Sequence, residues 1–222
     1  MKYKSKIIIL ILLAILSFVL YNTYENYFPK KENTTIDNNY WLKKPAIYVY
    51  SDKNEYVNLK LNLNWKLTYS YPKYDKNWWN FQMNNNKIFL NKVNYDYLFR
   101  EWEYFWNINY NKNKWFIVKK ENINDFLYEK LDEMWLNQKE INDFIVYWGP
   151  ILSKNKYNYV YFLNNDFSKI ANISTTPNYD SIVRVYMLYK KVDKLENIEP
   201  QKFEKFQRKW LTIVEWGGSE VK

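Results

Sequence analysis

The sequence predicts an α+β fold, mostly antiparallel β-sheet with one αα-hairpin packed on it and preceded by a single N-terminal transmembrane helix. Three observations support this class. Short segments of alternating apolar and polar residues recur through most of the chain. Residues 121–150 show the periodicity of two short helices. The first 24 residues combine lysines with a long apolar run.

The segment 1–24 is interpreted as a signal anchor. Lys2, Lys4 and Lys6 precede an apolar run over residues 7–20. Positive charges before an apolar run favour an N-terminus that stays inside the cell, so the rest of the chain is expected outside the cytoplasmic membrane. The run is short for a full span, but tyrosines flank it on both sides, and aromatic side chains are favoured at membrane interfaces.

A cleaved signal peptide is the alternative interpretation of this segment. Cleavage sites follow small residues, whereas residues 20–23 are Leu-Tyr-Asn-Thr, so an uncleaved anchor is preferred. Residues 25–40 are polar and aperiodic, which is typical of a tether. The remaining residues, 41–222, are expected to form one extracytoplasmic α+β domain on a protein that crosses the cell membrane once.

Residues 121–150 predict the αα-hairpin, because start signals, stop signals and apolar periodicity agree there. Asn122 is the expected N-cap of the first helix. Asn137 is the expected N-cap of the second, with Glu140 as its capping-box partner, and Gly149-Pro150 is expected to end that helix. Neither helix is long enough to be stable alone, so both must pack on the sheet. A DNA-reading helix-turn-helix is the alternative, and it would need a cytoplasmic location.

The clearest strand covers residues 57–63, where apolar residues alternate with asparagine and lysine. It is expected to form a hairpin with a strand at 67–71 through the two-residue turn Asn64-Trp65. The polar residues 193–209 are expected to include a short helix. Further strands are expected at 44–50, 79–83, 87–91, 95–99, 114–119, 157–163, 182–189 and 211–216.

The composition excludes several classes of chemistry. The chain has neither Cys nor His, so disulfides, thiolate metal sites, catalytic triads and most zinc sites are excluded, and no metal or cofactor is expected. The net charge of +9 is scattered along the chain and forms no basic cluster. It accompanies abundant Asn, Ile and Tyr, the usage of an AT-rich gene, so nucleic acid is not expected as a partner.

Glycine is scarce and tryptophan abundant, with 3 Gly and 11 Trp in 222 residues. Average usage would give roughly fifteen glycines in a chain of this length. Trp135 stands where the first helix must end in a left-handed conformation, and Trp65 stands in the expected hairpin turn. Both positions favour glycine, because a Cβ is strained there.

Three carboxylates are catalytic candidates. Glu101 and Glu103 are two residues apart and would share one face of a strand, where a third carboxylate beside them would allow acid–base catalysis. Glu215 stands in an apolar strand beside the Gly-Gly pair, a setting typical of a functional carboxylate. The preferred interpretations are a solvated strand edge for Glu101 and Glu103, and a buried ion pair with Arg184 for Glu215.

The binding candidates are mostly aromatic. Such rings can form a platform on which sugars stack, but core packing is the preferred interpretation. The chain has no glycine-rich phosphate loop, nucleophile elbow or zinc-binding spacing that would indicate another kind of site. The residues are Tyr48, Tyr97, Trp148, Arg184 and Trp216.

Five stretches give the chain a resemblance to a known family. They are KPAIYVY at 44–50, NLNWKLTYSYP at 62–72, YDYLFREW at 95–102, NQKEINDFIVYW at 137–148 and LTIVEWGG at 211–218. They resemble an uncharacterised family of bacterial extracytoplasmic proteins, membrane-anchored or lipoprotein-like. Its members open near KPVIYLYP, continue through GKLTYTYP and YLFWEG, and end near GFTVVEWGG. The family has no established activity, so the resemblance implies an extracytoplasmic location but no catalytic residue.

The departures from the family pattern mostly concern tryptophan and glycine. Trp148 and Trp216 match tryptophans of the family, whereas Arg100 replaces a tryptophan and Ser51 replaces a proline. The codon UGA encodes glycine in some bacterial lineages and tryptophan in others. We therefore hypothesise that five tryptophans are glycine in the native protein, misread from UGA. They are Trp65, Trp102, Trp115, Trp135 and Trp210, which all stand where the family pattern has glycine.

The expected function is a membrane-anchored module of the cell envelope that binds or assembles and does not catalyse. Its expected partners are the membrane, through residues 1–24, and an envelope polymer or protein. The alternative is a carboxylate-dependent hydrolase of envelope glycans that uses Glu215 with Glu101 or Glu103. Two carboxylates facing each other across an open cleft would favour the hydrolase, and a buried, ion-paired Glu215 would favour the module.

The decoding hypothesis predicts UGA codons at Trp65 and Trp135. Reading the gene checks this directly. UGG at both positions would rule the hypothesis out.

Overall fold

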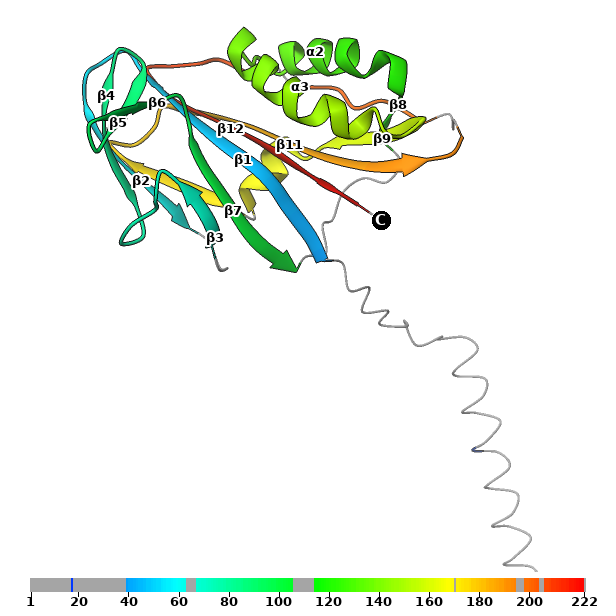
Figure 1. The fold of residues 1–222 in the computed structure, drawn as a ribbon, viewed down its shortest axis with the longest axis horizontal. Helices are drawn as coiled ribbons and strands as arrows, with labels where there is room; N and C mark the ends of the chain where they lie inside the picture. The colour runs from blue at the N-terminus through cyan, green and yellow to red at the C-terminus, as the bar shows by residue number, and fades with distance from the viewer. Residues whose placement is uncertain are drawn as a thin grey trace, which may run out of the picture. The chain divides into compact units, whose positions relative to one another are not determined.

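The computed structural model describes residues 17, 39–62, 67–105, 114–169, 171–194, 198–203 and 206–221 (Figure 1). The chain divides into two units, residues 1–37 and 38–222, and all the elements below belong to the second. No helix among these described residues is long and apolar enough to cross a membrane. The expected anchor and tether lie outside the described residues, apart from Ser17, Asn39 and Tyr40.

The second unit has three layers, which confirms the predicted α+β class (Figure 1). Two helices cover one face of a seven-stranded sheet, and a five-stranded sheet packs against its other face. Strand β1 (Asn39–Ser51) shows the division, because successive strand residues point to opposite faces. Ala46 and Tyr48 join the core under the helices, and Ile47 and Val49 join the core against the second sheet.

The seven-stranded sheet has the order β3-β7-β1-β12-β11-β9-β8. Neighbouring strands are antiparallel except β11 and β12, which are parallel. Parallel neighbours need a long crossover, and residues 193–210 supply it. The remaining strands of this sheet are β3 (Leu67–Tyr71), β7 (Leu98–Phe105), β8 (Phe116–Lys119), β9 (Tyr157–Phe162), β11 (Ser181–Val192) and β12 (Leu211–Glu220).

The five-stranded sheet has the order β10-β2-β4-β5-β6. Two-residue turns join β4 to β5 and β5 to β6, at Asn85-Asn86 and Asn91-Lys92, and all four residues have positive φ. Such turns match the twist of the strands that they join, and asparagine tolerates them well. The strands are β2 (Tyr56–Asn62), β4 (Trp79–Asn84), β5 (Lys87–Leu90), β6 (Val93–Tyr95) and β10 (Asn172–Thr176).

The expected hairpin of residues 57–63 with 67–71 is wrong. Strand β2 pairs with β4 and β10, whereas β3 pairs with β7 in the other sheet. The alternation correctly predicts the buried face of β2, but alternation does not specify the neighbouring strand. The link over residues 63–66, Trp65 included, lies outside the described residues.

Three further strand and helix predictions need correction. The strand expected at 95–99 is divided between β6 and β7, because Asp96 and Tyr97 separate them. Strand β10 was not expected, because its sequence Asn-Ile-Ser-Thr-Thr has little apolar content. The described part of 193–209 contains no helix.

Pro45 sits in β1, a central strand, where proline removes a backbone donor. The pairing register of β1 shifts there on both sides, against β12 between Lys43 and Ala46 and against β7 between Leu42 and Ala46. Proline is tolerated at such bulges, where a ladder hydrogen bond is already interrupted.

The αα-hairpin is confirmed, with helices α2 (Ile123–Glu133) and α3 (Gln138–Leu152). Asn137 caps α3 in a capping box with Glu140, as expected. Asn122 precedes α2, but its side chain makes no capping hydrogen bond, because the 3₁₀ turn η1 (Lys120–Asn122) leads into the helix.

The expected stop at Gly149-Pro150 is wrong, since α3 continues to Leu152. Proline costs the helix one hydrogen bond, but Ser153 N still donates to Gly149 O at 2.9 Å. Leu152 is fully buried in the core under the helices, and its packing favours the last turn of the helix.

The turn between the helices has the left-handed residue that the sequence predicts. Trp135 has φ 63° and its side chain is 43% exposed. Leu136 N donates to Leu131 O at 3.1 Å and Trp135 N to Asp132 O at 2.8 Å, the two bonds of a Schellman motif. Leu131 and Leu136 are both buried, which completes the apolar contact of that motif.

Trp135→Gly should raise the free energy of unfolding by about 1 kcal/mol, because glycine adopts φ > 0 without a steric penalty. Trp148→Gly is the matched control, since the same change removes a fully buried ring and should lower stability by about 3–5 kcal/mol. Denaturant melts of both variants measure the difference. If both variants lose stability equally, Trp135 is a core residue and the interpretation of the turn fails.

Candidate functional site

Glu215 lies between two arginines on the face of the seven-stranded sheet opposite the helices. Arg184 is its register partner on β11, and Arg184 Nη2 lies 2.7 Å from Glu215 Oε2. Arg100 of β7 donates from Nη2 to Glu215 Oε1. All three side chains are at most 2% exposed. The expected ion pair is therefore present, and Arg100 joins it as a second cation that sequence reasoning missed.

This cluster, Arg100–Glu215–Arg184, places a net charge of +1 in the interior, because two guanidinium groups meet one carboxylate. Arg184 Nη2 is close to the carboxylate without being aligned for a hydrogen bond, and Nε and Nη1 of Arg100 have no hydrogen-bond partner among the described residues. Burial lowers the pKa of Arg100 to about 10, although the charge of Glu215 opposes the shift, so Arg100 remains charged at neutral pH.

Aromatic rings partly compensate the buried cations. The Arg100 Cζ lies 4.1 Å from the centroid of the Trp102 ring, and the Arg184 Cζ lies 5.1 Å from that of Phe167. Phe167 in turn stacks on Tyr186 at 4.3 Å between centroids, with 5° between the planes. The rings of Trp102 and Phe167 thus lie against the two guanidinium groups, and Tyr186 stacks on Phe167.

Four of the five tryptophans of the decoding hypothesis are among the described residues. Trp102 and Trp115 are buried, at 1% and 3% exposure, and Trp210 is 66% exposed. Of the four, Trp135 alone has a positive φ. The physical argument for glycine therefore applies at Trp135, and the hypothesis at the other positions rests on the family pattern.

Glu215 and Glu101, two of the candidate carboxylates, lie on opposite faces of the seven-stranded sheet. Glu101 follows Phe99 by two residues on β7, and Phe99 pairs with Ala46 on the helix side of the sheet. Glu215 pairs with Ile47, which points to the opposite side. Glu103 is two residues further along β7 than Glu101, in register with Trp41. Glu215 therefore meets arginines, and the sheet separates it from Glu101.

The aromatic binding candidates lie in the core under the helices. Tyr48, Trp148 and Trp216 are at most 1% exposed, and Tyr97 is half-buried beside Tyr48. The Tyr48 hydroxyl donates to Asp143 Oδ2 at 2.7 Å, and burial, with Asp143, raises the pKa of Tyr48 above its usual range. Since the three rings are out of reach of solvent, they form no sugar-stacking platform, and the preferred interpretation of core packing is confirmed for them.

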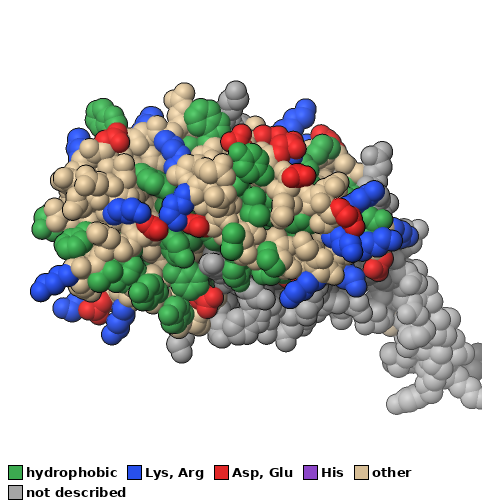
Figure 2. All heavy atoms as spheres, turned by 45° about the horizontal axis from the view of Figure 1, so that its top comes forward, with side chains coloured by type: hydrophobic (Ala, Val, Ile, Leu, Met, Phe, Trp, Pro, Cys, Tyr) green, Lys and Arg blue, Asp and Glu red, His purple; other side chains and the backbone are tan. Residues whose placement is uncertain are grey.

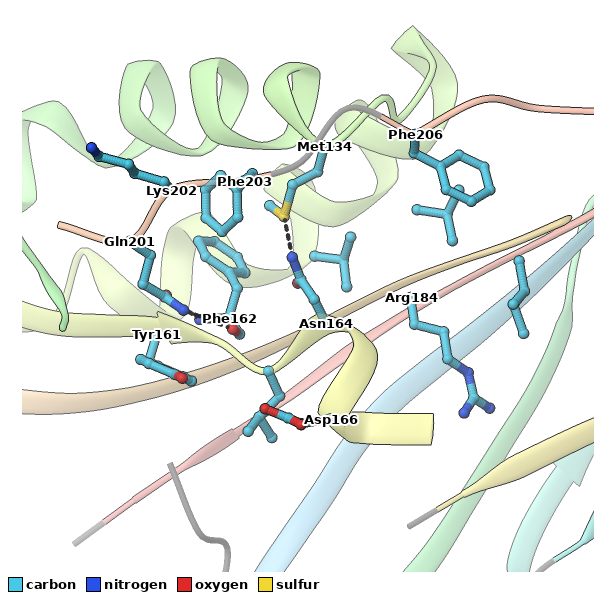
Figure 3. A pocket seen from close by; sticks show the side chains of 14 residues that line it. Met134, Tyr161, Phe162, Asn164, Asp166, Arg184, Gln201, Lys202, Phe203 and Phe206 are labelled. Carbon is cyan, nitrogen blue, oxygen red and sulfur yellow. Dashed lines mark hydrogen bonds between the residues drawn. The ribbon is translucent and has the colours of Figure 1, made fainter. Parts of the chain in front are cut away.

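A groove of about 400 Å³ opens where β9 ends and the 3₁₀ helix η2 (Asn164–Lys169) begins (Figure 3). One wall is apolar, formed by Met134, Phe203 and Phe206. Gln201 closes one end, because its side chain accepts from Phe162 N and donates to Phe162 O. Sequence reasoning missed this groove, since its lining comes from the helix turn, η2, β11 and the crossover, which are far apart in the chain.

The surface carries mixed charges on the face that Figure 2 shows. Lysine and arginine side chains lie among acidic and apolar ones there, and they do not merge into one basic patch. A nucleic-acid interface would need a continuous basic face, so this face does not favour one.

No protein-family model, curated protein or solved structure matches this chain.

The cluster gives a stability prediction that distinguishes its members. Glu215→Ala leaves two buried guanidinium groups without a carboxylate and should lower the free energy of unfolding by about 3–5 kcal/mol. Arg184→Met leaves the hydrogen-bonded Glu215–Arg100 pair, which is neutral, and removes two nitrogens, Nε and Nη2, that have no hydrogen-bond partner among the described residues. It should therefore change stability by less than about 1 kcal/mol or raise it.

Denaturant melts of the two variants test this expectation. Arg100→Met is the intermediate case, because it removes the hydrogen bond to Glu215 but leaves Arg184 to neutralise the carboxylate. A loss above about 3 kcal/mol for Arg184→Met would contradict the assignment of Arg184 as the surplus cation.

Proposed function

We propose that this protein is a membrane-anchored extracytoplasmic module of the bacterial cell envelope, which binds a partner and does not catalyse a reaction. The motifs at 44–50, 137–148 and 211–218 resemble those of an uncharacterised extracytoplasmic family, and this resemblance supports the location. The lysines before the apolar run at 7–20 support the same location, because they favour an N-terminus inside the cell and therefore a C-terminal domain outside it.

The observation that carries the binding proposal is the contrast between the carboxylates and the groove. Glu215 is enclosed by two arginines, while the groove is open and largely lined by apolar and amide side chains. The groove's described lining includes one carboxylate, Asp166, which is paired with Lys169. Acid–base hydrolysis of glycans uses two carboxylates on either side of the scissile bond. The described lining therefore supports binding better than hydrolysis.

The glycan hydrolase is the weaker alternative. It would need Glu215 to reach solvent together with Glu101 or Glu103. Glu215 is 1% exposed, and Glu101 lies on the other face of the sheet. A conformational change large enough to bring them together would have to break the buried ion pairs, which is strongly unfavourable.

The proposed location predicts the behaviour of two reporter fusions after Lys222. Alkaline phosphatase, which folds actively outside the cytoplasm, should be active, and a reporter that works only in the cytoplasm should be silent. The physical reason is the lysine-flanked apolar run, which holds the N-terminus inside. The opposite pattern, active only in the cytoplasm, would overturn the proposed location. A variant with Lys2, Lys4 and Lys6 neutralised serves as the control, because it should weaken the preference of the N-terminus for the inside of the cell.

A further inference from the structure

The seven-stranded sheet has a step at the groove. Strand β11 pairs with β12 over residues 181–189 but with β9 over 187–192 alone. After Phe162 the chain leaves the sheet, and Leu163 N makes one last bond, to Tyr186 O at 2.9 Å. In the described part of the chain, residues 181–185 of β11 therefore have a strand neighbour on one side only. This free edge lines the groove, which includes residues 182–185 (Figure 3).

Two hydrogen bonds show which backbone groups point along the free edge. Tyr186 O accepts on the β9 side, and Tyr189 O accepts from Val221 on the β12 side. Because backbone groups alternate between the two sides of a strand, the N–H and C=O groups of even-numbered β11 residues point toward β9, and those of odd-numbered residues point toward β12. The N–H and C=O groups of Ile182 and Arg184 therefore point into the groove, in the position that β9 would have occupied.

Asn164 adds a polar group without a partner at the same place. Its Nδ2 donates to Met134 Sδ at 3.3 Å, a weak acceptor, and its buried Oδ1 has no hydrogen-bond partner among the described residues (Figure 3). Asn164 also has φ 41°, in the left-handed region. A buried amide oxygen without a partner is unfavourable, and a ligand N–H would satisfy it.

The charges of the lining leave the interior of the groove uncharged. The Arg184 guanidinium points away from the groove, to Glu215 on the other face (Figure 3). Asp166 is exposed and paired with Lys169, and Lys202 is exposed. The interior thus offers backbone hydrogen bonds, one amide and an apolar wall.

We propose that the groove binds an extended, uncharged polypeptide segment of a partner protein, which adds to β11 as an eighth strand in place of the missing continuation of β9. Its backbone would bond Ile182 and Arg184, its next amide would reach Asn164, and one apolar side chain would pack on Met134, Phe203 and Phe206. Strand addition of this kind takes its affinity from the main chain and its selectivity from the side-chain pocket.

A polypeptide fits these groups better than a glycan or an acyl chain. A strand presents N–H and C=O groups at the spacing of Ile182 and Arg184, two residues apart, as glycans do not. An acyl chain would leave the backbone groups of the edge and Asn164 without partners. The proposal rests on the proposed function only in that the partner belongs to the envelope, so peptide binding and location are tested separately.

The test uses the full chain in nanodiscs and a displayed library of random ten-residue peptides. Enriched peptides are resynthesised, and their dissociation constants are measured by fluorescence anisotropy. The expected consensus is apolar at alternate positions, without charged residues in the centre. N-methylation at the alternate residues that donate to β11 should weaken binding by about tenfold each, whereas methylation at the residues between them should have little effect.

Two variants of the protein test the same contact from the other side. Ile182→Pro removes an edge N–H that makes no hydrogen bond to any of the described strands, and proline is tolerated at a strand edge. Asn164→Ala removes the buried amide. Each should weaken the selected peptides by about tenfold. Val146→Ala is the matched control, because Val146 is 76% exposed on α3 and does not line the groove.

The outcomes separate the proposal from its alternatives. No enrichment of any peptide, or equal binding by wild type, Ile182→Pro and Asn164→Ala, would overturn strand addition in the groove. Peptides that tolerate N-methylation at every position would also overturn it, whether or not Ile182→Pro folds. Loss of binding in the two variants and not in Val146→Ala would support it. Reporter fusions that are active only in the cytoplasm would overturn the proposed location, but they would leave the peptide-binding results unaffected.

Discussion

The structure depends on β12, nine of whose ten residues are buried, with side chains on both faces of the large sheet. It lies between β1, with which it is antiparallel, and β11, with which it is parallel. Trp216 extends into the core under the helices, while Glu215 extends the other way to the arginines. Gly218 lets Trp148 approach, since a Cβ there would lie 2.8 Å from the indole and 2.6 Å from Met187 O. A side chain at this position would therefore push the helix layer off the sheet.

The sequence predicts the individual helices and strands of this fold better than it predicts which strands pair with each other. Alternation and capping depend on residues within one segment, so the face of β2, the capping box of Asn137 and the left-handed turn at Trp135 follow from local patterns. Strand pairing depends on distant segments, and therefore the partner of β2 was wrong. The pairing of Glu215 with Arg184 was predicted because each interrupts an apolar run, whereas Arg100 gave no such signal beside Glu101.

The groove could not be predicted, because it results from a difference in length between neighbouring strands. β9 ends at Phe162, which pairs with Met187, whereas β11 begins at Ser181, six residues before Met187. No local sequence pattern relates these two strand ends. The buried charges and the groove divide the roles of β11. Its Arg184 side chain holds the interior cluster on one face, while the backbone of the same residue points along the open edge. A strand can therefore be fixed firmly in the core and still present unpaired hydrogen-bonding groups.

Amide hydrogen exchange of β11, followed residue by residue by NMR, tests this account most directly. Val183 and Val185 point toward β12 and should exchange slowly, whereas Ile182 and Arg184 point into the groove and should exchange much faster. Addition of a selected peptide should then protect Ile182 and Arg184 specifically. Equal protection of all four amides in the free protein would contradict the account, because it would mean that the edge of β11 is already paired.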